Sequence, residues 1–223
     1  MKGFRIFLFS GALILAAVFF AGCAAIPDEP QQPAYYQTLN QWTKDTKVFK
    51  SLEGRLYIYA TYKSFTYRRA YVDEYAKRYG LDEDFKNILM ERELEMAGMY
   101  NEFFIAAFTP AAQWNDFEKD ESIWKLYLTD KTGVRLQPAE IERIDSNAPL
   151  YREFFPYLDP WSYGYIVKFP RYGPKGEGPV GEKESEFLKL TVTGLMGRGE
   201  LIWPLNAGGE GSQKMEDKGT KKD

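Results

Sequence analysis

Phe103-Phe-Ile-Ala-Ala-Phe-Thr109 is followed by two runs of the same kind, Ile123-Trp-Lys-Leu-Tyr-Leu-Thr129 and Val134-Arg-Leu-Gln137. Aromatic and β-branched residues are frequent in these runs, as is typical of strands. In the second run, apolar Trp124, Leu126 and Leu128 recur at every other position, which is strand periodicity. Asp130-Lys-Thr-Gly133 supplies a hairpin turn between the second and third runs. The pattern predicts short antiparallel strands.

Five further runs have the same character. They are 55–62, 140–144, 163–169, 187–193 and 200–203. Because no helical pattern separates the strands after about residue 100, we expect two antiparallel sheets packed face to face. An immunoglobulin-like β-sandwich is the first choice of fold, and an unclosed barrel is the alternative.

Two helices are predicted between the first of these strands and Phe103, as an α-hairpin inserted near residues 65–97. The first carries apolar residues near helical spacing: Phe65, Val72, Tyr75, Ala76 and Tyr79. Gly80 suits the left-handed position after a helix, and Asp82 suits the N-cap of the next helix. The second has apolar residues on one face: Phe85, Ile88, Leu89 and Met96.

The N-terminus has the order of an export signal. Lys2 and Arg5 precede an apolar run from Ile6 to Phe20, which ends in small residues. The run is shorter than the ~20 residues that a spanning helix needs. We therefore expect residues 1–22 to be a cleaved signal peptide.

Phe20-Ala21-Gly22-Cys23 resembles the lipobox of bacterial lipoproteins, with Phe20 where that family usually has Leu. The resemblance implies cleavage between Gly22 and Cys23 and a covalent lipid on Cys23, with three acyl chains in all, enough for stable anchoring. It implies a protein of the bacterial envelope. Because Ala24 rather than Asp follows the cysteine, it favours the outer membrane, facing the periplasm. The alternative is an ordinary thiol in an uncleaved helix.

The mature chain divides into three parts. Residues 23–41, with Pro27, Pro30 and Pro33, are expected to form a proline-rich tether. Residues 42–205 are expected to fold, and the charge-rich tail 206–223 buries too little apolar surface to order itself.

Composition excludes several classes of function. Removal of Lys2 and Arg5 with the signal takes the formal charge from −3 to −5, which argues against a nucleic-acid partner. The chain has no His, so Ser-His-Asp and Cys-His nucleophile systems and the usual zinc sites are excluded. With one Cys, no intramolecular disulfide can form. We expect no cofactor other than the lipid.

Several short motifs match signatures of enzymes or metal sites, but their predicted structural setting does not suit that chemistry. Ser122-Ile-Trp-Lys125 and Lys131-Thr-Gly133 match signatures of penicillin-binding enzymes, but Ser122 and Lys125 would point to opposite faces of one strand. Residues 115–121 space acids as calcium loops do but lack the glycine, so a solvated loop is preferred to weak calcium binding. Carboxylates that could act in pairs are Glu91, Glu93, Glu95 and Glu102. No pair stands out, and we assign no catalytic residue and no metal site.

One turn suggests a contact surface. Gly194-Leu-Met-Gly197 places Leu195 and Met196 between two strands, where polar residues are usual. They could form a contact loop for lipid or a partner, or fold back over the edge of the core.

Three hypotheses for function follow. The first is a non-catalytic interaction or assembly module of the envelope, held to the membrane through acylated Cys23 and binding an envelope protein. The second is a carrier of a lipid or another apolar ligand in a half-barrel. The third is a His-free hydrolase that uses carboxylates.

Overall fold

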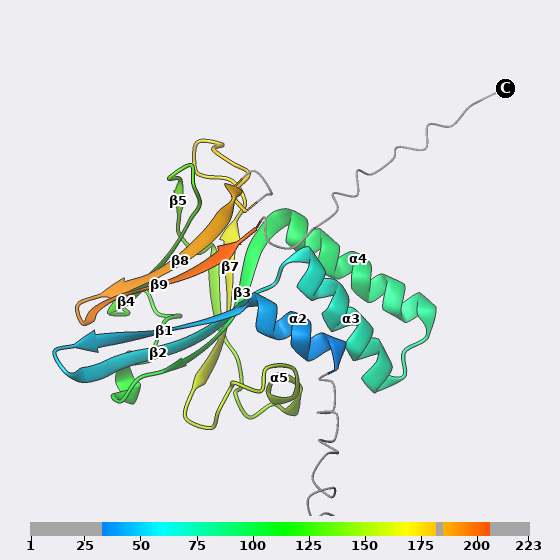
Figure 1. Ribbon diagram of the computed structural model, residues 1–223, viewed down its shortest axis with the longest axis horizontal. Coiled ribbons are helices and arrows are strands. Elements are labelled where there is room, and N and C mark those ends of the chain that lie inside the picture. The colour runs from blue at the N-terminus through cyan, green and yellow to red at the C-terminus, as the bar shows by residue number, and fades with distance from the viewer. Residues whose placement is uncertain (1–32, 182–184, 206–223) are drawn as a thin grey trace, which may run out of the picture. The chain divides into compact units, whose positions relative to one another are not determined.

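The computed structural model describes residues 33–181 and 185–205, which form two antiparallel sheets and several helices (Figure 1). The predicted signal peptide, Gly22, Cys23, most of the predicted tether and the charged tail lie outside the described residues. Within them, no helix is both long enough and apolar enough to span a membrane.

The two sheets contain five and four strands. The first has the order β1-β2-β3-β7-β6 and the second β5-β4-β8-β9, and all neighbours are antiparallel. The strands are β1 (Thr43–Lys50), β2 (Glu53–Tyr62), β3 (Tyr100–Phe108), β4 (Trp124–Thr129), β5 (Arg135–Leu136), β6 (Glu140–Arg143), β7 (Tyr163–Pro170), β8 (Phe187–Gly194) and β9 (Gly197–Pro204). The mainly β class and the two antiparallel sheets agree with the prediction, and the arrangement is consistent with a β-sandwich.

The described helices are α2 (Ala34–Trp42), α3 (Phe65–Tyr79), α4 (Glu83–Met99), α5 (Pro149–Phe154) and the 3₁₀ turn η2 (Ala112–Trp114). The two longest, α3 and α4, lie between β2 and β3 in the chain. Ser64 Oγ accepts a hydrogen bond from Tyr67 N at the start of α3, and Asp82 caps α4. Gly80, with φ 62°, ends α3.

The folded body begins earlier than the sequence analysis predicts. Residues 34–41, assigned to the tether, belong to α2, in which Tyr35, Leu39 and Trp42 are buried in the core. These three residues recur at helical spacing, and their burial outweighs the polar residues between them. Strand β1 was also missed, because three lysines in it hide its alternation.

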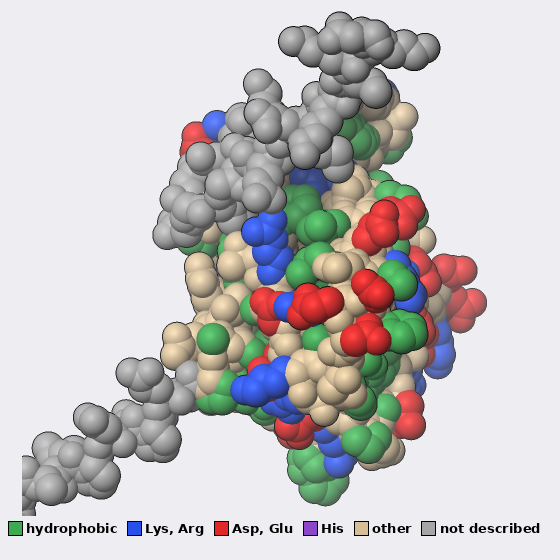
Figure 2. All heavy atoms as spheres, turned by 90° about the vertical axis from the view of Figure 1, so that its right-hand side faces the viewer, with side chains coloured by type: hydrophobic (Ala, Val, Ile, Leu, Met, Phe, Trp, Pro, Cys, Tyr) green, Lys and Arg blue, Asp and Glu red, His purple; other side chains and the backbone are tan. Residues whose placement is uncertain are grey.

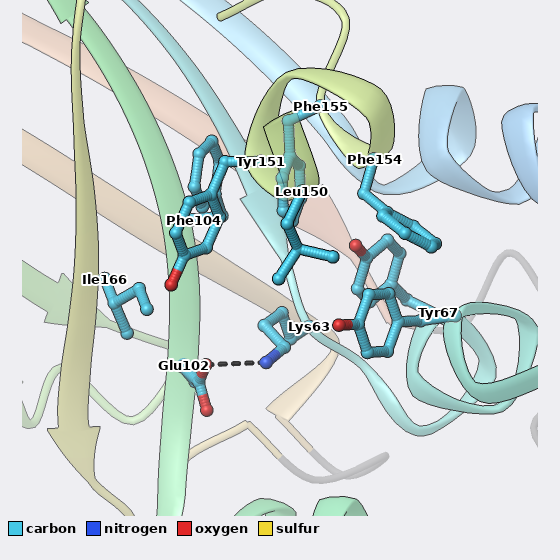
Figure 3. Close-up of a pocket in the computed structure, with 10 residues that line it drawn as sticks. Lys63, Tyr67, Glu102, Phe104, Leu150, Tyr151, Phe154, Phe155 and Ile166 are labelled. Carbon is cyan, nitrogen blue, oxygen red and sulfur yellow. Dashed lines mark hydrogen bonds and ion pairs between the residues drawn. The ribbon is translucent and has the colours of Figure 1, made fainter. Parts of the chain in front are cut away.

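Strand β3 is buried on both faces, which explains its nearly continuous apolar run. Phe103 faces the second sheet, where its ring lies 5.1 Å from that of Trp203. Phe104 points to the opposite face, where its ring stacks on Phe155 just after α5. We call α5 and the residue after it, 149–155, the α5 segment. Helices that include this segment therefore cover the outer face of the first sheet, and Phe104 lies beneath them (Figures 1 and 3).

Helix α4 leaves part of its predicted apolar face in solvent, whereas Leu89 and Met96 of that face are partly buried. Phe85 and Ile88 are 62% and 54% exposed, and Ala97 is the one residue of α4 that is fully buried. Charged residues are frequent along α4, and Figure 2 shows a face of the molecule on which acidic and basic side chains lie beside hydrophobic ones.

Candidate functional site

A small pocket lies on the outer face of the first sheet, between that sheet, α3 and the α5 segment (Figure 3). Its volume is about 130 Å³. Its lining residues are Lys63, Tyr67, Tyr71, Glu102, Phe104, Leu150, Tyr151, Phe154, Phe155 and Ile166. We refer to it as the aromatic pocket, because six of these ten side chains are Phe or Tyr.

The walls come from segments far apart in the sequence. Tyr67 and Tyr71 are four residues apart on α3 and therefore share one face of that helix. Opposite them, the Phe155 ring lies flat on Phe104, with centroids 3.6 Å apart and an angle of 6° between the planes. Tyr151 stacks on the same Phe104 ring at 5.8 Å. Mutual stacking therefore fixes the shape of the walls.

Four charged side chains gather at the sheet end of the pocket. Lys63 Nζ lies 2.7 Å from Glu102 Oε1 and 3.5 Å from Glu93 Oε2. Arg68 Nη2 lies 3.0 Å from Glu102 Oε2, and Arg68 also pairs with Glu93. The Arg68 side chain is fully buried. Two cations and two carboxylates thus form a balanced cluster, which we call the charge cluster.

The charge cluster keeps the Glu102 carboxylate ionised. Burial alone would raise the pKa of Glu102, but the charges of Lys63 and Arg68 and their hydrogen bonds outweigh burial and hold it below the ordinary value. A carboxylate with a lowered pKa is a poor proton donor at neutral pH. The cluster is therefore suited to holding the strand ends and α3 in place.

The tyrosines of the pocket are held neutral. Burial raises the pKa of Tyr71, and the nearby Glu93 carboxylate raises it further. Burial also raises the pKa of Tyr67, which is completely enclosed. Neutral phenols next to phenyl rings give the pocket an apolar lining with polar groups at its edge.

The size of the aromatic pocket limits its occupant. A cavity of about 150 Å³ holds a single benzene ring, and pockets for drug-sized ligands measure about 300–1,000 Å³. The aromatic pocket, at about 130 Å³, therefore matches one apolar side chain or ring.

A second recess of about 380 Å³ lies beside β4 and residues 137–141. Five charged residues line it, together with several apolar ones. They are Glu118, Lys119, Asp120, Lys125 and Glu140. Its polar lining does not suit a lipid chain.

The predicted contact loop is a two-residue turn between β8 and β9. Leu195 is 80% exposed, whereas Met196 is partly buried and packs against the core. The two residues therefore face different surroundings.

Among the candidate carboxylates, the structure brings Glu93 and Glu102 together and leaves Glu91 and Glu95 exposed. Ser122 Oγ donates to Asp116 Oδ1, whereas Lys125 Nζ donates to Asp120 O, so this serine and lysine do not pair. No group of three or more acidic residues within the described ranges could hold a metal ion.

Sequence reasoning missed most of the aromatic pocket. The signal was present as tyrosines every fourth residue along α3, at Tyr67, Tyr71, Tyr75 and Tyr79. Their partners in the α5 segment, Phe154 and Phe155, follow a helix of only six residues, which carries too little periodicity to be recognised.

Comparisons with known protein families, with curated proteins and with solved structures found no match for this chain.

Proposed function

We propose that this chain is a lipid-anchored envelope protein with a non-catalytic role, and that its aromatic pocket binds one apolar side chain of a partner protein. The observation that carries the proposal is the aromatic pocket itself, which has the volume of a single ring. Residues that anchor protein interfaces are mostly large side chains that fill such preformed, desolvated recesses.

The lining supports a protein ligand. Tyr71 and Tyr151 are partly exposed at the pocket, so their hydroxyl groups are available to the backbone or polar edge of an incoming segment. Such residues supply large contact area at a small entropic cost. Lys63 and Glu102, which also line the pocket, are already paired with each other.

The two other hypotheses have less support. A lipid carrier needs a larger apolar cavity, and the larger of the two recesses is lined by charged residues. A carboxylate-based hydrolase needs an acid with a raised pKa, whereas the pKa of Glu102 is lowered.

The location rests on the resemblance of Phe20-Ala21-Gly22-Cys23 to a lipobox. Cys23 would carry the lipid and Gly22 would end the signal peptide, with the outer membrane favoured by Ala24. Mass spectrometry of the purified N-terminus tests this, with Cys23→Ala as the variant that should carry no acyl chains. Recovery of Met1 from the native chain, or of Cys23 without acyl chains, would reject the anchor.

We also propose an immunoglobulin-like topology for the sandwich. The orders β2-β3-β7-β6 and β5-β4-β8-β9 correspond to A-B-E-D and C′-C-F-G of that fold, with antiparallel neighbours throughout. In this reading β1 is an additional edge strand, and α3 and α4 are a hairpin inserted between A and B.

Photo-crosslinking in the native cell tests the pocket proposal. A crosslinking residue in place of Tyr151 should give one discrete protein adduct, and Ile166→Phe, which fills the pocket, should abolish that adduct. A crosslinker at Ile202, half exposed on β9, is the matched control and should give no such adduct. An adduct that persists in Ile166→Phe would contradict binding in the pocket.

A further inference from the structure

Two neighbouring hairpin turns each present a leucine to solvent. The β1–β2 turn carries Leu52, which is 98% exposed, and the β8–β9 turn carries Leu195, which is 80% exposed. Phe49, just before the first turn, is 54% exposed. Positions at hairpin turns are usually polar or glycine, so two independent turns depart from this rule in the same way.

The two turns lie against each other at one end of the sheets (Figure 1). Lys50 Nζ in β1 lies 3.5 Å from Leu195 O and 4.0 Å from Met196 Sδ. Gly197 approaches β1 so closely that a Cβ there would lie 2.6 Å from Val48 Cγ1. We define the tip patch as Phe49, Leu52, Leu195 and Met196.

The surroundings of the tip patch are basic, although the whole chain has a formal charge of −3. Lys47 and Lys50 form no ion pair with any described residue. The acids nearby are neutralised, because Glu53 pairs with Arg55. On the second hairpin, Glu200 pairs with arginine and lysine. The patch therefore carries a net positive charge.

We infer that the tip patch inserts into the surface of an anionic lipid bilayer. Protruding leucine and phenylalanine side chains can enter the boundary between headgroups and acyl chains. Lysines beside them extend their charged ends to acidic headgroups, and each such lysine strengthens binding. The two leucines, Leu52 and Leu195, stand on projecting turns, which suits insertion into a fluid interface.

This inference does not rest on the proposed lipid anchor or on the aromatic pocket. Residues 24–223 contain every residue that the structure describes and lack the only cysteine of the sequence, so any vesicle binding by this chain is independent of acylation. A failure to bind would leave the other two proposals intact.

Co-sedimentation of residues 24–223 with vesicles tests the inference. Vesicles of phosphatidylglycerol should bind the chain, and vesicles of phosphatidylcholine should bind it much more weakly. The double variant Leu52→Ser and Leu195→Ser should lower partitioning by about tenfold or more, because each leucine loses its apolar transfer. Lys50→Gln should lower it by about fivefold.

Matched controls lie on the helices. Phe85→Ser removes a side chain of similar exposure from α4, and Lys77→Gln removes an exposed lysine from α3. Neither should change partitioning. Equal losses in these controls, or binding that does not depend on anionic lipid, would overturn the inference.

A single cysteine placed at Leu52 or at Leu195 and labelled with a polarity-sensitive fluorophore gives a second measurement. The emission should shift to the blue on addition of phosphatidylglycerol vesicles, whereas a label at Phe85 should not respond. If the labels at both tips stay in water while the chain binds, insertion is wrong. If the tips respond instead to a purified envelope protein and never to vesicles, the patch is a protein contact and the inference fails.

Discussion

Arg68 Nη2 lies 3.0 Å from Glu102 Oε2, and the two side chains are 0% and 5% exposed. The guanidinium comes from α3 and the carboxylate from β3, so this contact ties a helix to the sheet beneath it. Since Glu102 also lines the aromatic pocket, the stability of the fold and the shape of the pocket depend on the same charges.

Arg68→Ala should lower the free energy of unfolding by about 3–5 kcal/mol, because it leaves Glu93 and Glu102 with Lys63 as their remaining cation in a buried place. Urea denaturation measures the change. Lys77→Ala on the exposed face of the same helix should change stability by less than about 0.5 kcal/mol. Equal effects of the two substitutions would show that the charge cluster contributes little.

Stability should fall in acid because of Glu102. Its pKa in the folded state lies below the value of about 4.3 for an unfolded glutamate. The stabilisation is therefore present above the unfolded pKa and is lost as the pH falls through the folded pKa, from about pH 5 downward. Melting temperatures across this range should drop less steeply for Glu102→Gln than for the native chain. Glu91→Gln, at an exposed site, should follow the native curve.

The buried tyrosines should limit stability in alkali. Burial raises the folded-state pKa of Tyr35 and Tyr67 above the ordinary value of about 10. Their stabilisation is complete below the unfolded pKa and is lost as the pH rises toward the folded pKa. Tyrosinate absorbance should therefore appear in two stages, and these two buried rings should ionise only in the second, as circular dichroism reports unfolding. Ionisation of all tyrosines in a single stage, with the fold intact, would contradict the burial of Tyr35 and Tyr67.

Substitution of two different glycines by alanine should change the stability of the protein in opposite directions. Gly197 has φ 140°, and a Cβ there would lie 2.6 Å from Val48 Cγ1, so Gly197→Ala should destabilise the protein by about 1–3 kcal/mol. Gly98 lies inside α4, and a Cβ there would meet nothing within 4 Å. Gly98→Ala should stabilise it by about 0.5–1 kcal/mol. Thermal unfolding distinguishes the two, and a shared sign would refute the argument.

Much of the β framework could be predicted from the sequence. The runs around Phe104, Trp124 and Leu190 alternate or are continuously apolar, and all three lie in strands. The caps at Gly80 and Asp82 follow from local conformational preferences, which depend little on the rest of the chain.

The aromatic pocket could not be predicted in the same way. Its walls meet only after residues near 67, 104 and 155 come together, and single-sequence periodicity carries no information about such pairings. Burial of α2 also depends on a surface formed elsewhere, since Tyr35 donates its hydroxyl hydrogen bond to Phe154 O. In α4 the opposite happens: apolar side chains at helical spacing stay exposed, because periodicity alone does not guarantee that another element covers them.

The most direct test of the central claim is a titration of residues 24–223 with p-cresol, a probe with the size of one tyrosine side chain, followed by NMR. We expect saturable shifts of the signals of Tyr71 and Tyr151, which should be absent in Ile166→Phe and present in the control Ile202→Phe. Palmitate should not compete. Unsaturable shifts spread over the molecule, or displacement of the probe by palmitate, would contradict a pocket made for one apolar side chain.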